Sequence, residues 1–142
     1  MLLWIGKGVF SPDFTHLNNT EMLKQDTENK LNEIIEAITD KKGHKITLLD
    51  MSEIDTAPAN NFVICQGKST SQVSSVADSI RERLQKNLNV KPFNYDGYKN
   101  SQWIIIDYGD IMVHVFLPEQ REFYNLEDLW SDAQTTIIPD ID

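Results

Sequence analysis

The chain has 142 residues, the length of one domain, and its 22 acidic residues outnumber its 13 basic residues to give a net charge of −9. This charge argues against a direct, non-specific nucleic-acid binder, because phosphate contacts need a basic surface. The sequence has a single cysteine, no signal-peptide pattern and no apolar run of the ~18 residues that a membrane-spanning helix needs. We therefore expect a cytoplasmic protein with no membrane partner.

The first part of the chain predicts one helix. Residues 1–25 show no clean periodicity, and we interpret them as a poorly ordered extension, with a short helix near its end as an alternative. Asp26 or Thr27 can cap a helix that Gly43 ends. The apolar residues of this helix share one face at the i, i+3, i+4, i+7 spacing, and they are Leu31, Ile34, Ile35 and Ile38.

Two strands and a long helix are expected next. Residues 45–50 and 62–66 are short, apolar and partly β-branched, which is typical of strands. Ser69 can cap the longest helix, which we expect to end near Asn87. The apolar face of this helix consists of Val73, Val76, Ala77, Ile80 and Leu84.

Three further strands follow. Pro92 forces an extended backbone, so residues 91–95 are predicted to form a short strand. Residues 101–107 are apolar on both faces, which indicates a central strand. After a turn at residues 108–110 the chain returns in a strand at residues 111–116, most simply antiparallel to the one before.

The chain closes with a predicted helix and an acidic tail. The helix should begin at Pro118. Its apolar face is predicted to hold Phe123, Leu126, Leu129 and Trp130. Residues 134–142 are expected to be a frayed acidic tail. Residues 119–142 hold seven acids and one arginine, which is −6 of the total charge. This charge fits either a solvated face or a surface that steers a basic partner.

The order of elements predicts an α/β fold. We expect one mixed sheet of about five strands with helices packed on it. Within this fold, one cysteine and three scattered histidines cannot supply a recognisable zinc site. Cys65 lies inside an apolar strand and is interpreted as a buried structural thiol. Residues 67–70 invite a phosphate-loop interpretation, but Phe62 stands where that motif needs glycine.

Chemistry-bearing side chains are densest at residues 103–116. Asp107 and Asp110 are either a carboxylate pair or turn residues that bind their own backbone. Alternation places the His114 side chain on the other face of its strand from Val113 and Val115. Its role can be that of a structural histidine, an exposed histidine or a general base. Trp103 and Tyr108 are residue types found both in cores and as anchors of protein interfaces.

These residues carry a family resemblance. Residues 45–52 end in Leu-Asp-x-Ser, residues 62–67 precede a long helix, and residues 95–98 read Tyr-Asp-Gly-Tyr. The run Trp-x3-Asp-Tyr-Gly-Asp-x3-His-Val-Phe begins at Trp103, and Tyr-x-Leu-Glu-x-Leu-Trp follows it. Over residues 26–133 the chain resembles the Iojap family, the ribosomal silencing factors.

The resemblance implies a binding protein without cofactor, not an enzyme. Family members dock on ribosomal protein L-fourteen of the large ribosomal subunit, where they block joining of the small subunit and damp translation when nutrients are short. They tend to form homodimers. Their fold is similar to that of nucleotidyltransferases, whose Gly-Ser…Asp-x-Asp signature is absent here. A nucleotide-dependent transferase remains the alternative.

The family's partner-binding residues can be placed on this sequence. Trp103 would be the aromatic anchor. The residues of the same patch, or of the turns that shape it, would be Tyr95, Gly97, Asp107, Tyr108, Gly109 and Asp110. His114 matches the family histidine, whose role stays open. Asn60 stands where the family has an aspartate, so a role that needs this carboxylate is in doubt.

Overall fold

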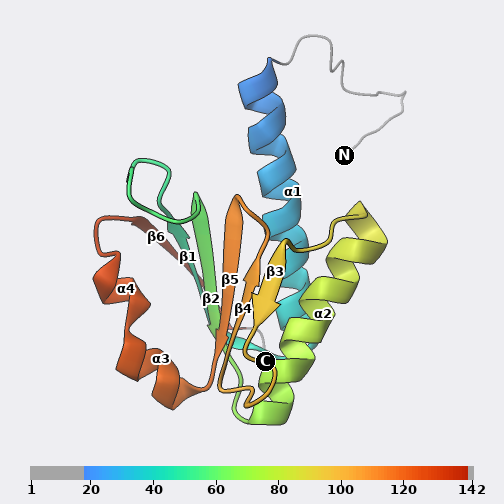
Figure 1. The fold of residues 1–142 in the computed structure, drawn as a ribbon, viewed down its shortest axis with the longest axis vertical. Coiled ribbons are helices and arrows are strands. Elements are labelled where there is room, and N and C mark those ends of the chain that lie inside the picture. The colour runs from blue at the N-terminus through green and yellow to red at the C-terminus, as the bar shows by residue number, and fades with distance from the viewer. Residues whose placement is uncertain (1–17, 141–142) are drawn as a thin grey trace.

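The computed structural model describes residues 18–140, which form one mixed sheet between two layers of helices. The strand order is β3-β4-β5-β2-β1-β6, and Figure 1 shows α1 and α2 on one face and α3 and α4 on the other. The elements are α1 (Asn19–Asp40), β1 (His44–Asp50), β2 (Asn61–Gln66), α2 (Thr70–Leu88), β3 (Asn94–Asp96), β4 (Trp103–Asp107), β5 (Ile111–Phe116), α3 (Pro118–Tyr124), α4 (Leu126–Leu129) and β6 (Gln134–Ile138). The predicted α/β class is therefore confirmed.

Helix α1 begins earlier than the sequence predicts. The Asn18 side chain caps it by accepting a hydrogen bond from the Glu21 backbone N–H at 2.8 Å. Met22 and Leu23 are exposed and extend no apolar period into the first turns, so the helix continues N-terminal to the predicted caps Asp26 and Thr27. Residues 19–25 are therefore helical, and the rest of the predicted extension, residues 1–17, lies outside the described residues.

The layer of α1 and α2 makes the main core. Ser69 caps α2 as predicted, with its hydroxyl oxygen accepting from the Gln72 backbone N–H at 3.1 Å. The apolar faces predicted for the two helices meet each other and the sheet, and their fully buried members include Ile34, Ile38, Ile80 and Leu84. Each such side chain contributes roughly 1.5–3 kcal/mol by leaving water.

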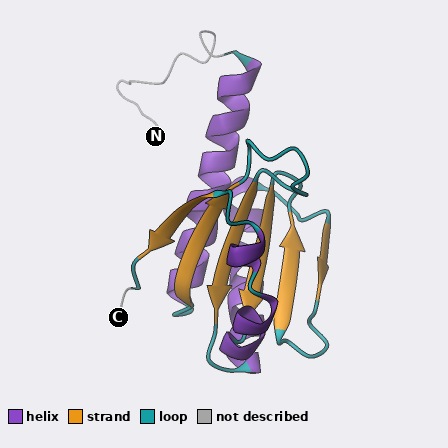
Figure 2. Ribbon diagram, turned by 90° about the vertical axis from the view of Figure 1, so that its left-hand side faces the viewer, coloured by secondary structure: helices purple, strands orange, loops and turns teal. Residues whose placement is uncertain are grey.

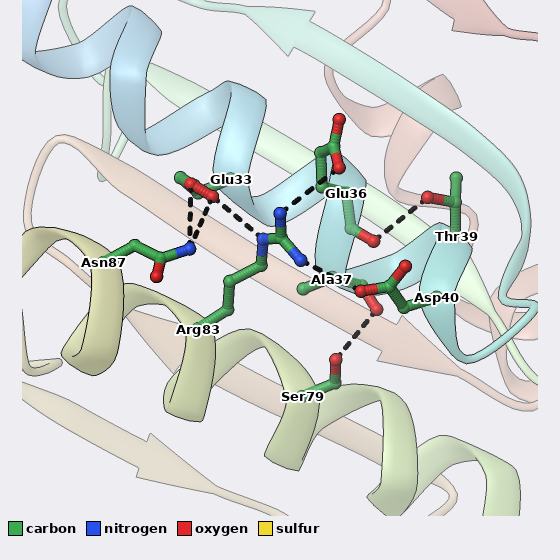
Figure 3. Close-up of polar contacts among 8 residues, drawn as sticks. All are labelled: Glu33, Glu36, Ala37, Thr39, Asp40, Ser79, Arg83 and Asn87. Atoms are coloured by element: carbon green, nitrogen blue, oxygen red, sulfur yellow. Dashed lines mark hydrogen bonds and ion pairs between the residues drawn. The ribbon is translucent and has the colours of Figure 1, made fainter.

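An ion-pair network at the surface joins α1 to α2 (Figure 3). The Arg83 guanidinium of α2 contacts carboxylates of Glu33 at 2.9 Å, Glu36 at 3.2 Å and Asp40 at 2.9 Å. Asn87 also donates to Glu33 at 3.0 Å. All three acids come from α1, so one arginine fixes the helix pair in register.

The sheet differs from prediction in two places: it has a sixth strand, β6, at one edge, and β4 lies next to the other edge rather than at the centre. Strand β6, which was expected to be a frayed tail, pairs antiparallel with β1 as a sixth strand. It shows no alternation because four of its five residues are exposed. The Asp140 carboxylate accepts from the Lys45 backbone N–H at 2.7 Å just beyond the strand. β4 pairs antiparallel with β5 as predicted but lies next to the edge strand β3.

The second face of the sheet is covered by α3 and α4, which are short and separated (Figure 2). Pro118 occupies the first turn of α3 as expected. The single predicted helix is broken at Asn125, which adopts a left-handed conformation with φ of 45°. Its predicted apolar face is wrong in part, because Phe123 and Leu129 are 80% and 69% exposed while Leu126 is buried.

The consequence for β4 is that its two faces differ. Ile104 and Ile106 are buried under α2, whereas Trp103 and Ile105 on the opposite face are half-buried. The strand is therefore apolar on both faces without being covered on both. Among residues 18–140 no helix has the length and apolar character to cross a membrane.

Candidate functional site

Aromatic side chains gather where β4 meets α3. The Trp103 ring lies 4.6 Å from the ring of Tyr124, which in turn lies 5.0 Å from the ring of Phe123. We call Trp103, Phe123 and Tyr124 the aromatic surface. Trp103 is half-buried, and the other two are exposed. Exposed aromatic side chains next to one another are typical of protein interaction sites.

Trp103 is the best-held member of the aromatic surface. It begins β4 and pairs in register with Phe116 of β5, on whose ring it stacks at 4.9 Å and 22°. Its indole Nε1–H donates a hydrogen bond to Nδ1 of His114 at 3.1 Å. The indole is therefore fixed by one stacked ring and one hydrogen bond.

His114 lies beneath Trp103, buried among aromatic rings. It is 3% exposed and its ring lies 4.5 Å from that of Phe62. As predicted, it points away from Val113 and Val115, which belong to the core under α1 and α2. Burial lowers the pKa of His114 to about 3, so the imidazole is neutral and Nδ1 can accept a hydrogen bond. Of the three predicted roles, a structural, an exposed or a general-base histidine, the geometry fits the structural one.

Tyr108 does not belong to the aromatic surface. It is 4% exposed and packs in the core under α1 and α2. Burial raises the pKa of its phenol well above the usual range. Of the two predicted places for Tyr108, the surface patch is therefore wrong, because the residue follows the inward-facing Ile104 and Ile106 in alternation. Tyr108 lies instead in the turn between β4 and β5.

Tyr95 lies on the opposite face of the sheet from Trp103. It pairs with Ile106, whose side chain is buried on the α2 face. Its ring is covered by the Arg81 guanidinium of α2, with the guanidinium carbon 3.7 Å from the ring centre. The predicted residues therefore do not form one patch, since neighbouring positions of paired strands alternate between faces.

Gly97 and Gly109 shape turns. Both have positive φ, of 105° and 89°. A Cβ at Gly97 would overlap the carbonyl oxygen of Trp103, and a Cβ at Gly109 would come within 2.6 Å of the Phe93 ring. The backbone around Trp103 therefore requires glycine at position 97.

The two aspartates of the β4–β5 turn have separate structural partners. Asp107 accepts from the Gly109 backbone N–H at 2.8 Å, which is the turn interpretation. Asp110 accepts from the Thr27 hydroxyl at 2.7 Å and forms an ion pair with Lys30 at 3.2 Å, so it fastens α1 to the turn. Across the described part of the chain, no three His, Cys, Asp or Glu side chains are placed to hold a metal ion.

The remaining candidates lie away from the aromatic surface. Asn60 is exposed, its backbone carbonyl accepts from the Met51 N–H at 2.8 Å, and it borders a hollow of about 490 Å³ beside α1. Cys65 is fully buried, as predicted, and burial raises the pKa of its thiol to about 12. In the loop at residues 67–70, the Lys68 backbone N–H donates to the Gln72 side chain at 2.7 Å and the Gly67 N–H donates to the Phe116 carbonyl at 3.0 Å, so these two amides already have partners within the protein.

Arg121 fixes α3, the helix that carries Phe123 and Tyr124, to α4 and to the sheet. Its guanidinium pairs with Glu127 of α4 at 2.7 Å and donates to the Lys45 carbonyl at 2.6 Å and the Thr47 hydroxyl at 3.0 Å in β1. In the sequence, Arg121 is the one arginine of the acidic segment at residues 119–142 and Tyr124 begins the Tyr-x-Leu-Glu-x-Leu-Trp run, and neither residue has a predicted role. Neither burial nor pairing of Arg121 is visible in a local pattern.

Comparison with known proteins agrees with this fold. The family described as "Ribosomal silencing factor during starvation" matches residues 24–142. Two curated relatives are named ribosomal silencing factor RsfS. The Halalkalibacterium halodurans protein is 38% identical over 101 residues, which cover 71% of this chain and 85% of the relative. The Bacillus subtilis protein is 38% identical over 97 residues, which cover 68% and 80%.

A solved structure supports the same assignment. The crystal structure of a Chromobacterium violaceum protein is similar with a TM-score of 0.69 and 34% identity, covering 73% of this chain and 85% of the other. The family match extends through β6, beyond the predicted limit at residue 133. By sequence and by fold, the chain belongs to the family of ribosomal silencing factors.

Proposed function

We propose that this protein binds the large ribosomal subunit through ribosomal protein L-fourteen and thereby blocks joining of the small subunit, which represses translation when nutrients are limiting. Membership of the silencing-factor family supports a role in translation. The observation that carries the proposed mode of action is the aromatic surface of Trp103, Phe123 and Tyr124. A blocking protein needs a rigid surface in the right place and no catalytic group.

The packing of the aromatic surface suits an interface. Trp103 is held by the Phe116 ring and by His114, so little side-chain entropy remains to be lost on binding. Phe123 and Tyr124 project from a helix that Arg121 fixes to the sheet. Large, rigid aromatic side chains contribute most to binding free energy in protein interfaces.

The charge around the aromatic surface suits a basic partner. Glu119 and Glu122 line a hollow together with Phe123. Glu127 forms an ion pair with Arg121. The negative charge at the rim of the aromatic surface therefore comes from Glu119 and Glu122. Acidic rim residues raise the association rate with a basic protein, and this effect weakens as salt rises.

Co-sedimentation with isolated large subunits tests the proposal. Trp103→Ala should weaken binding by about 2 kcal/mol or more, which is roughly a thirtyfold rise in Kd. Tyr95→Ala is the matched control, because Tyr95 lies on the opposite face, and it should pellet like the wild type. Circular dichroism establishes that each variant is folded.

Two outcomes would contradict the proposal at different points. If wild-type protein does not pellet with large subunits, ribosome binding itself is wrong. If Tyr95→Ala loses binding and Trp103→Ala keeps it, the partner uses the other face of the sheet. A subunit-joining assay on sucrose gradients then measures whether bound protein lowers the yield of joined ribosomes.

We also propose that the protein is a cytoplasmic homodimer when free, as the family resemblance implies. Light scattering coupled to size-exclusion chromatography measures the mass of the free protein and of its complex with L-fourteen. A free protein with the mass of one chain at micromolar concentration contradicts the dimer and leaves the ribosome proposal intact.

A further inference from the structure

The hydrogen bond between Trp103 and His114 is the only polar contact of the indole within the described residues. Nε1 of Trp103 is the donor, because an indole nitrogen cannot accept, so Nδ1 of His114 must carry no proton. The neutral imidazole then has its hydrogen on Nε2. The distance of 3.1 Å is within the range of ordinary N–H hydrogen bonds.

The other contacts of Trp103 do not select one ring orientation. The indole stacks on Phe116 at 4.9 Å and lies 4.6 Å from the Tyr124 ring. Stacking tolerates a rotated or shifted ring, and the torsion that turns an aromatic ring about its Cβ–Cγ bond is broad. A hydrogen bond is directional, so His114 distinguishes the observed orientation from the flipped one.

His114 is poorly explained by stability alone. It is buried among Phe62, Phe116 and Trp103, where an apolar side chain would fill the space without desolvation cost. Within residues 18–140, Nε2 of His114 has no hydrogen-bond partner. A buried polar atom without a partner costs free energy of folding. The histidine therefore brings an acceptor to Trp103 while leaving its own Nε2 unpaired, a cost that an apolar side chain would not carry.

We propose that His114 is a positioning residue: its Nδ1 holds the Trp103 indole in the orientation that the aromatic surface presents to its protein partner. This rests on the proposed function, since the surface must be a binding site for the orientation to matter. His114 itself is covered and touches no partner. The pKa of His114, lowered by burial to about 3, means that the acceptor persists at neutral pH.

Three variants separate positioning from packing. His114→Phe keeps a ring and removes the acceptor. His114→Leu removes both and serves where the first variant is overpacked. His114→Asn places a carbonyl oxygen near the former position of Nδ1 and so retains an acceptor. The readouts are the NMR signal and hydrogen exchange of the Trp103 indole N–H in the free protein, and the Kd for large subunits. The signal is assigned by its loss in Trp103→Phe.

The expected results follow from the directional bond. In His114→Phe the Trp103 indole signal should shift and exchange about tenfold faster, and Kd should rise about tenfold, the equivalent of one net hydrogen bond. The melting temperature should stay the same or rise. In His114→Asn the signal should return toward its wild-type position and Kd should lie within about threefold of wild type.

Failure of this inference is distinguishable from failure of the proposed function. If Trp103→Ala loses binding while His114→Phe and His114→Leu bind like wild type, the positioning role is wrong and the proposed function stands. If Trp103→Ala binds like wild type, the aromatic surface is not the binding site. An indole signal that is unchanged in His114→Phe also overturns the inference. Binding that falls in parallel with stability in all three variants indicates a purely structural histidine.

Discussion

The two faces of the sheet differ in what covers them. On one face, α1 and α2 run the length of the strands and bury a continuous aliphatic core that includes Ile34, Ile80 and Ile104. On the other, α3 and α4 are short and leave Trp103 and Ile105 half-buried beside exposed aromatic rings. The α3 and α4 face has a buried cluster of its own, which includes Leu49, Ile64 and Phe116, but it also presents the exposed rings of Phe123 and Tyr124. Under the proposed function, the face under α1 and α2 serves folding alone, whereas the other face also carries partner recognition. Each prediction below tests this division.

The largest expected effect is on the covered face. Ile80 is fully buried between α2 and the sheet, so Ile80→Ala removes packed methyl groups and leaves a cavity. The free energy of unfolding should fall by about 2–5 kcal/mol in urea denaturation. Large-subunit binding by the fraction that stays folded should be unchanged. A specific loss of affinity would show that the two faces are coupled.

An intermediate effect is expected on changing the pH. Burial lowers the pKa of His114 to about 3 from 6.5, so below pH 6.5 the unfolded chain takes up a proton that the folded chain does not. The lowered pKa therefore has no effect on stability well above pH 6.5, and it destabilises the folded protein as the pH falls, by about 2 kcal/mol between pH 6.5 and pH 5. Urea denaturation at both pH values measures it.

His114→Asn is the control for this pH effect. It removes the titrating group while His44 and the carboxylates stay, so the difference in pH dependence between the two proteins isolates His114. Identical slopes for wild type and variant would mean that the pKa of His114 is the same in the folded and unfolded states, contrary to the effect of its burial.

The smallest effect on stability is expected at the aromatic surface. Phe123 is 80% exposed, so Phe123→Ser should change the free energy of unfolding by less than about 0.5 kcal/mol. Binding to large subunits should nevertheless weaken measurably. Leu129→Ser, at an exposed apolar position of the neighbouring helix α4, is a matched comparison for stability. A variant of Phe123 that unfolds more readily would place this residue in the core after all.

The covered face was largely predictable from sequence. The apolar periods of α1 and α2, the Ser69 cap and the antiparallel β4–β5 pair all appear as predicted, because regular burial leaves a regular pattern. Apolar periodicity does not reveal a helix turn or an edge strand that is exposed to solvent. The start at Asn19 and the strand β6 were missed for these reasons.

The candidate site was harder to predict. The sequence indicates Trp103 as an anchor but groups it with Tyr95 and Tyr108. Strand alternation places both tyrosines on the face of the sheet that α1 and α2 cover, opposite Trp103. Phe123 was assigned to a core-facing helix, since a break in the left-handed conformation at Asn125 cannot be seen from apolar spacing. Which apolar residues stay exposed depends on how far a short helix reaches across a sheet.

Gly97 shows how a mutational map of this protein can mislead. Any side chain at this position would overlap the carbonyl oxygen of Trp103 in a backbone conformation that other residues rarely adopt. Substitution would displace the start of β4 and the indole with it. In a genetic screen for loss of silencing, Gly97 would therefore score beside Trp103 without contacting the partner. Sensitivity to substitution marks the shape of the surface as well as its contacts.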